Sequence, residues 1–231
     1  MKVYEILYKV YLLEDISLKE VQREIFRIID ITLGKSEDTL RLHNKNDFKN
    51  YCFNSFYPIE KDGVYKEGNI YTITIRTIDK SLMTYFNKNL PFAYTTRIRG
   101  LKTQLKVLPK KKIRKIYSIT PVIIKNDQGY WRGIMEKEEY IKRIKENLIK
   151  KYNGFLKTEI NEEFEIFKSF EFKNNKPISN NYKGKSLLGD KISIEIEDNV
   201  QAQDIIYMSL GTGVGEMNAR GLGFMGYRWE W

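Results

Sequence analysis

The sequence predicts an α+β protein with two tandem ferredoxin-like (βαββαβ) domains and a C-terminal glycine-rich loop. Three observations support this fold class. Short segments alternate apolar and polar residues, longer segments carry apolar residues at helical spacing, and their order starts again after a basic connector at 109–115. We therefore expect an N-terminal domain over residues 1–109 and a C-terminal domain over residues 116–231.

In the first half, residues 3–13 are predicted to form a strand. The next helix is expected to begin at Ser17, where Glu20 completes a Ser-x-x-Glu capping box, and to end at Gly34. Its apolar face consists of Leu18, Val21, Ile25, Ile28, Ile29 and Leu33. The remaining elements are strands over 38–43, 48–57 and 69–78, a helix over 80–89 stopped by Pro91, and a strand over 92–108.

The second half repeats this order. A strand is predicted over residues 116–125 (IYSITPVIIK), followed by a helix over 136–152. One side of that helix carries Tyr140, Ile141, Ile144, Leu148, Ile149 and Tyr152. Strands over 163–173 and 185–197, a helix over 200–209 and a last strand over 223–230 complete the pattern.

Composition indicates a cytoplasmic protein without a membrane segment. The 42% hydrophobic content supports a core, yet no apolar run approaches the roughly 18 residues that span a bilayer. The N-terminus alternates apolar and charged residues, unlike a signal peptide, and the lone Cys52 fits a reducing compartment. One His and one Cys exclude the usual zinc cage, whereas counting alone does not decide about a carboxylate-bound magnesium site. We expect neither a metal nor a cofactor.

The formal net charge of +10 favours a nucleic-acid partner, because a positive surface attracts phosphates. The 13% aromatic content adds rings on which unpaired bases stack. A lysine-rich proteome would also explain the charge. Two basic clusters are interpreted either as phosphate contacts or as solvated strand edges. They contain Lys110, Lys111 and Lys112 with Arg114 and Lys115, and Arg97 with Arg99 and Lys102.

The C-terminal stretch GTGVGEMNARGLGFMG is unusually rich in glycine. Residues 221–226 match G-x-G-x-x-G, but too little chain follows for a dinucleotide-binding unit. Gly184, Lys185 and Ser186 form half of a P-loop, with Ser179 where its first glycine belongs and no helix following, which excludes an ATPase. Two explanations stay open: backbone N–H groups that approach phosphates, or a tight loop with positive φ angles packed between sheet and helix.

His43 is the single histidine. In a strand with Leu40 and Leu42 turned inward, it lies at the strand end on the polar side. A lone histidine is more often ordinary than catalytic, although its usual pKa of about 6.5 suits proton transfer near neutral pH.

The stretch GTGVGEMNARGLGFM resembles the C-terminal signature of the CRISPR-associated endoribonucleases that cut precursor CRISPR RNA within its repeats. These enzymes belong to the repeat-associated mysterious protein (RAMP) superfamily. The segments YCFNSFYP, IYSITPVIIK and EYIKRIKENLIKKYNGF are similar to the family's strand after the catalytic histidine, the start of its second domain and its long helix. The resemblance covers most of the chain and implies two tandem ferredoxin-like domains, with the glycine loop beside RNA in the cleft between them.

The resemblance also implies a metal-free reaction in which the RNA 2′-OH attacks the neighbouring phosphate, leaving a 2′,3′-cyclic phosphate and a 5′-OH. By position, His43 matches the catalytic histidine and Lys49 a catalytic lysine, with Lys45 as a rival. The RNA-binding residues expected from the loop and the basic clusters are Gly211, Gly213, Gly215, Asn218, Arg220, Gly221, Gly223, Arg97, Lys110, Lys111 and Lys112. The implied partners are CRISPR repeat RNA and an effector complex, with the protein a monomer or homodimer.

One departure from the family concerns the first helix, where several members carry a tyrosine. Here the matching region, Phe26 to Ile29, has no hydroxyl, and Tyr51 is a weak substitute. The glycine signature does not separate nucleases from their non-cleaving relatives. The alternative is therefore a non-cleaving RNA-binding subunit of a CRISPR complex, and a third is a basic RNA-binding protein unrelated to CRISPR.

Overall fold

The structure is a computed structural model that describes residues 1–35, 48–182 and 184–230. The strand predicted over 38–43 lies outside the described residues. Within those ranges, no helix is long and apolar enough to cross a membrane. In the same ranges, no three His, Cys, Asp or Glu side chains meet in an arrangement that holds a metal ion.

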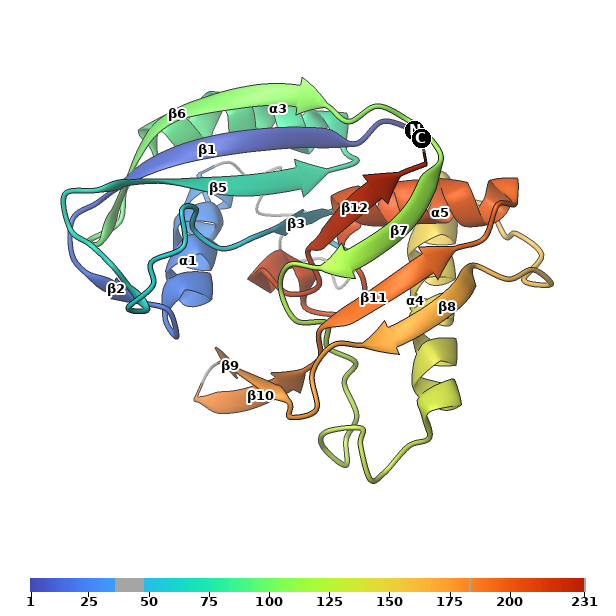
Figure 1. Ribbon diagram of the computed structural model, residues 1–231. Coiled ribbons are helices and arrows are strands. Elements are labelled where there is room, and N and C mark those ends of the chain that lie inside the picture. Colours follow the sequence, from blue (N-terminus) through green and yellow to red (C-terminus); the bar gives the residue numbers. More distant parts are fainter. Residues whose placement is uncertain (36–47, 183, 231) are drawn as a thin grey trace.

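The N-terminal half forms a four-stranded sheet in the order β3-β5-β1-β6. Every neighbouring pair is antiparallel. Helices α1 (Val21–Leu33) and α3 (Lys80–Asn89) pack on this sheet and share one buried cluster with it (Figure 1). The strands are β1 (Tyr4–Leu12), β3 (Tyr51–Phe53), β5 (Ile70–Thr77) and β6 (Ile98–Val107).

The C-terminal half repeats the same arrangement, with an antiparallel sheet in the order β12-β7-β11-β8. Its strands are β7 (Ile113–Ser118), β8 (Phe167–Phe172), β11 (Ile192–Ile196) and β12 (Met225–Trp229). Helices α4 (Lys137–Leu156) and α5 (Val200–Thr212) lie behind this sheet (Figure 1). In both sheets the first and third strands are central, which is the ferredoxin-like order, so the predicted fold class is confirmed. The chain passes from one sheet to the other between Val107 and Ile113.

Two small sheets are added to this frame. One pairs β2 (Ile16–Ser17) with β4 (Val64–Tyr65), and the other is the hairpin of β9 (Ile178–Tyr182) and β10 (Lys185–Gly189). The single strand predicted over 185–197 is therefore wrong, because the chain turns between β10 and β11. At the turn, the buried Asp190 carboxylate accepts hydrogen bonds from Tyr130 Oη and Trp131 Nε1, both at 2.7 Å. These contacts hold the chain away from a straight strand.

The predicted start of the first helix also needs correction. Helix α1 begins at Val21, and no side chain caps its N-terminus. The Ser17 hydroxyl donates to the Glu20 carboxylate at 2.8 Å, while the Ser17 backbone pairs with Val64 in the β2–β4 sheet. That pairing takes Ser17 out of the N-cap position, and Leu18 is left 55% exposed. By contrast, α3 has the bounds that the sequence predicts, with the Asp79 side chain accepting from the first-turn N–H groups.

The two halves share a polar contact between Arg76 and the last strand. Arg76 Nε donates to Glu5 Oε2 at 2.7 Å within the N-terminal sheet, and its Nη1 donates to the Met225 carbonyl oxygen at 2.7 Å. The guanidinium also lies 4.4 Å from the Phe224 ring centroid. Arg76 is only 6% exposed, so these bonds tie β5 to the end of the glycine-rich segment.

Candidate functional site

The glycine-rich loop connects α5 to β12 and contains the short 3-10 helix η2 (Asn218–Arg220). Asn218 lies at its centre, where Nδ2 donates to the carbonyl oxygens of Val214 and Leu222, both at 3.0 Å. The backbone has positive φ at Gly213, Gly215, Met217, Gly221 and Gly223. These positive φ angles fold the loop back on itself. A tight loop with positive φ angles is one of the two explanations that the sequence offered for its many glycines.

Protein atoms fill the space that side chains would need at these glycines. A Cβ at Gly223 would lie 2.0 Å from the Val214 carbonyl oxygen, and one at Gly215 would lie 2.6 Å from that of Ile123. Gly211 is a residue of α5, since the helix runs three residues beyond its predicted end to Thr212. A Cβ at Gly211 would meet the Ile78 side chain at 2.7 Å, so this glycine packs the helix against the N-terminal half. The glycines are thus explained by internal packing, and their approach to phosphate stays a prediction.

Lys151 is buried beneath this loop, and it is not among the site residues predicted from the sequence. Its Nζ donates to the carbonyl oxygens of Gly213 at 3.0 Å and Gly215 at 2.7 Å, and to Asn218 Oδ1 at 2.7 Å. The residue is 3% exposed. The helical spacing indicates this burial, because Lys151 falls three residues after Leu148 on the apolar side of α4.

Burial lowers the pKa of Lys151 to about 7, while the nearby Cys52 and Glu216 act in the opposite direction. An ammonium has three N–H donors, and the loop supplies three oxygen acceptors at hydrogen-bond distance. A neutral amine would leave one acceptor unpaired. The geometry therefore fits the charged lysine, whose lost hydration the loop oxygens replace.

A cavity of about 590 Å³ lies where the loop meets the N-terminal half, and Lys49 lines it. Lys125, Lys151 and Arg220 line the same cavity, so among the described residues four basic side chains and the acidic Glu216 surround it. The structure thus brings Lys49 together with the loop residues Gly215, Asn218 and Arg220. His43 and Lys45 lie outside the described residues. A concave, basic site of this kind suits a phosphate group.

The aromatic residues at this cavity have distinct environments. Tyr51 is 3% exposed, and burial raises the pKa of its hydroxyl, with the charge of Arg220 opposing the shift. The Arg220 guanidinium lies 3.4 Å from the ring centroid of Phe26 on α1, a close cation–π contact. Phe26 falls in the region where the resemblance implies a tyrosine, and it lines the cavity without offering a hydroxyl.

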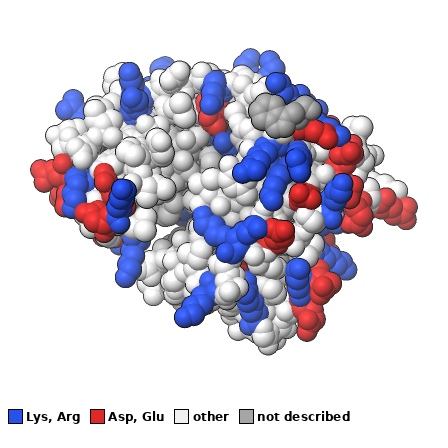
Figure 2. All heavy atoms as spheres, in the orientation of Figure 1, with Lys and Arg blue, Asp and Glu red and all other residues white. Residues whose placement is uncertain are grey.

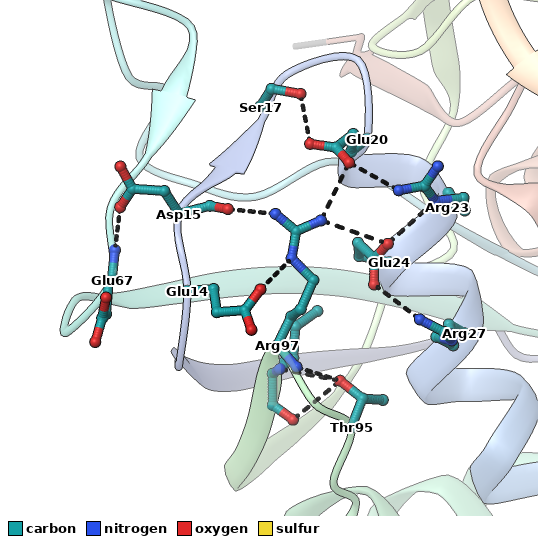
Figure 3. A network of polar contacts seen from close by, with 11 residues as sticks. Glu14, Asp15, Ser17, Glu20, Arg23, Glu24, Arg27, Glu67, Thr95 and Arg97 are labelled. Carbon is teal, nitrogen blue, oxygen red and sulfur yellow. Dashed lines mark hydrogen bonds and ion pairs between the residues drawn. The ribbon is translucent and has the colours of Figure 1, made fainter.

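Arg97 is engaged in a network of acidic side chains (Figure 3). Its guanidinium pairs with Glu14 and Glu20 at 3.2 Å and with Glu24 at 3.7 Å, and it donates to the Asp15 carbonyl oxygen. The hydrogen bond from Ser17, together with Arg97, lowers the pKa of Glu20 to about 2, although burial opposes the shift. Because these carboxylates neutralise Arg97 and its side chain is only 17% exposed, its placement counts against the predicted phosphate contact.

The connector lysines lie away from the cavity. Lys110 pairs with Asp204 of α5 at 2.7 Å, and Lys112 pairs with Glu230 at 2.5 Å and with Asp198 at 3.1 Å. Asp198 and Asp204 lie just before α5 and in its first half, and Glu230 follows β12. The glycine loop begins at the opposite end of α5. The helix rises about 12 Å from Asp204 to its end at Thr212, so the predicted RNA-binding residues do not form one cluster.

Lys111 is exposed and has no ion pair among the described residues. Figure 2 shows further Lys and Arg side chains over the C-terminal sheet, with some Asp and Glu side chains among them and others grouped at the left and right ends of this face. Basic side chains are therefore not confined to the cavity.

Tandem ferredoxin-like domains with a glycine-rich loop before the last strand are the arrangement that the resemblance to the RAMP superfamily implies. Residues 103–227, more than half of the chain, match the family described as "CRISPR associated protein Cas6, C-terminal". The chain belongs to this CRISPR-associated family. No curated protein sequence matches the chain significantly.

Solved structures share the fold over nearly the whole chain. One described as "CRISPR associated protein Cas6" has a TM-score of 0.75 at 18% identity, covering 98% of this chain and 99% of its own. "An RAMP protein binding different RNA substrates" has a TM-score of 0.72 at 13% identity, covering 97% and 99%. A Cas6-related protein from Pyrococcus furiosus has a TM-score of 0.71 at 15% identity, covering 98% of both chains. At these identities the likeness concerns the fold.

Proposed function

We propose that this protein is a metal-independent endoribonuclease that cuts precursor CRISPR RNA within the repeat and so makes mature guide RNA. One observation carries the proposal: Lys49 lines the same basic cavity as the glycine loop. Lys125 and Arg220 border this cavity as well. An RNA phosphate held there is surrounded by positive charge, and membership of the CRISPR-associated family supports RNA as the substrate.

The reaction needs groups that move two protons and stabilise one anion. The 2′-oxygen forms a bond to the adjacent phosphorus while the bond from phosphorus to the 5′-oxygen breaks. The 2′-OH loses its proton, the leaving 5′-oxygen gains one, and the products are a 2′,3′-cyclic phosphate and a 5′-OH. His43 carries out one of these transfers, and each positioned transfer group contributes about 10²–10⁴-fold. Lys49 stabilises the crowded phosphorane by its charge.

The glycine loop lines one side of the cavity in a fixed conformation. Lys151 and Asn218 hold its carbonyl oxygens by hydrogen bonds, so the loop does not have to be ordered by the RNA. The buried ammonium of Lys151 adds positive charge beneath the loop. Both features favour binding of a phosphate in the cavity.

The decisive experiment is RNA cleavage in excess EDTA, with repeat RNA as substrate. We expect a single cut by the wild type, none with a 2′-deoxy residue at the cut position, and a loss of about 10²-fold or more in His43→Ala and Lys49→Ala. Lys150→Ala removes an exposed lysine of α4 and serves as the matched control with unchanged rate. Cutting that stops in EDTA, or that proceeds on 2′-deoxy RNA, rejects the mechanism.

The second candidate function is a non-cleaving RNA-binding subunit of a CRISPR complex. Phe26 favours it, because α1 presents a ring without a hydroxyl at the cavity. RNA that binds but stays intact in the same experiment identifies this function. A cut that survives His43→Ala directs the search to Lys49, Lys45 and Tyr51.

The remaining assignments belong to the same proposal. Residues 1–109 form the domain with the catalytic histidine, and residues 116–231 form the domain with the RNA-binding loop. The protein acts in the cytoplasm on CRISPR repeat RNA, as a monomer or homodimer, and passes its product to an effector complex.

A further inference from the structure

A second cavity, of about 240 Å³, adjoins the first. It lies between α1, the glycine loop and the β9–β10 hairpin, which reaches from the C-terminal half toward α1 (Figure 1). Phe26, Met217 and Arg220 line both cavities, so these side chains form a shared wall. Leu187 of the hairpin and Leu222 of the loop contribute apolar surface.

Of the residues that the structure describes, three carboxamides also line this second cavity: Gln22 of α1 and Asn180 and Asn181 of β9. The Gln22 Oε1 atom is buried and accepts no hydrogen bond from any described residue. None of the described residues lining the cavity is acidic. The Gln22 oxygen packs against Gly221, where an added Cβ would lie 2.0 Å from it. Carboxamides both donate and accept hydrogen bonds, so an occupant with polar edge groups fits this lining better than a purely apolar one.

We propose that the second cavity binds one unpaired nucleobase of an RNA strand whose phosphates lie in the first. A base is flat and carries both donors and acceptors on its edge, which carboxamides match in both directions. Its faces stack on aromatic rings and on guanidinium planes. Phe26 and Arg220 already stack on each other at 3.4 Å, so the base stacks on an outer face of this pair. The proposal rests on the proposed function only in that RNA occupies the first cavity.

The hairpin is the specificity element in this arrangement. Asn180 and Leu187 are paired neighbours on its two strands, so both move with the hairpin as a unit. Asn180 Nδ2 donates to the Ile178 carbonyl oxygen at 3.2 Å and keeps a second N–H, so its side chain still offers both a donor and an acceptor to a ligand. Gln22, Asn180 and Asn181 then provide the hydrogen bonds that distinguish one base from another.

The test uses fluorescein-labelled ten-nucleotide RNAs of A, C, G or U and an abasic strand with the same number of phosphates. Leu187→Trp fills the cavity with an indole, and Gln22→Leu removes the carboxamide at similar size. Ile59→Trp adds the same indole at a position that is 71% exposed and is the matched control. Circular dichroism and urea unfolding verify that each variant is folded.

We expect the wild type and Ile59→Trp to bind at least one base-containing strand about 10-fold or more tighter than the abasic strand. Leu187→Trp should bind that strand only as tightly as the abasic one, and Gln22→Leu should lose preference among bases while keeping the abasic affinity. Equal affinity of the wild type for all strands, or a preference that survives Leu187→Trp, overturns the base site and leaves the cleavage proposal standing. Failure to bind any strand, including repeat RNA, overturns both.

Discussion

Lys151 Nζ donates a hydrogen bond to Asn218 Oδ1 at 2.7 Å, which joins the third quarter of α4 to the centre of the glycine loop. The same asparagine donates to the carbonyl oxygens of Val214 and Leu222, and the same lysine donates to those of Gly213 and Gly215. These two side chains thus bind the backbone on both sides of Asn218. Contacts within the C-terminal half therefore fix the loop conformation without a ligand.

Replacing Lys151 by methionine should destabilise the protein. Methionine is an unbranched side chain of similar length but without the ammonium group. The three loop oxygens lose their buried donor, so we expect a loss of about 2–4 kcal/mol in the free energy of unfolding. Urea unfolding at pH 7 measures it. Lys150→Met, at the exposed neighbouring position, should be nearly neutral. Equal stabilities of the two variants would show that the loop does not depend on the lysine.

The contact between Glu5 and Arg76 should make stability depend on pH. Although burial opposes ionisation, the charges of Arg76 and Lys106 hold the pKa of Glu5 below its usual value. A carboxyl with a lowered pKa in the folded state stabilises the protein above the unfolded pKa of about 4.3, and this contribution disappears as the pH falls through the folded pKa. Glu5→Gln should therefore cost about 3 kcal/mol at pH 7 and much less near pH 2.

Urea titrations of the wild type and Glu5→Gln at both pH values check this sign. Glu159→Gln, at an exposed position, is the control and should change little at either pH. A Glu5→Gln deficit that is as large in acid as at neutral pH would contradict the assignment.

The steric need for glycine at position 223 is testable with a matched pair. Gly223 and Gly133 both have positive φ, +67° and +86°, but only Gly223 has a backbone oxygen within 2.0 Å of an added Cβ. Gly133→Ala should cost about 1 kcal/mol from its backbone conformation alone. Gly223→Ala adds the clash with Val214 and should cost clearly more, measured by urea unfolding. Similar costs would mean that the loop relaxes to admit the methyl group.

Lys111 and Arg97 were both predicted from the sequence to contact RNA, but they have different environments in the structure. If the protein binds RNA as proposed, Lys111→Ala should lower the slope of log affinity against log salt by about 1, because one phosphate contact is lost. Arg97→Ala should leave that slope unchanged and instead cost about 2 kcal/mol of stability, since Arg97 is bound by Glu14, Glu20 and Glu24. Binding titrations at several salt concentrations measure the slopes. A lower slope in Arg97→Ala would restore it as a phosphate contact.

Local signals predicted some elements of the fold well. The bounds of α3 follow from Asp79 and from the proline just beyond its end, which act on their own neighbourhood in the chain. The start of α1 was misplaced because Ser17 pairs with Val64, and that pairing is invisible to a capping rule. The turn between β10 and β11 was missed because it depends on Trp131 contacting Asp190, 59 residues away.

By itself, the sequence determined the α+β class and the repeated order of helices and strands in two halves, while a role for Lys49 beside the glycine loop came only from the family resemblance. Only the tertiary structure decided that Arg97 is neutralised by Glu20, 77 residues away, and that Lys151 is buried against Asn218, 67 residues away. The physical reason is that periodicity and turn preferences depend on adjacent residues. The electrostatic role of a charged side chain depends on which distant groups it meets and on how much water it loses.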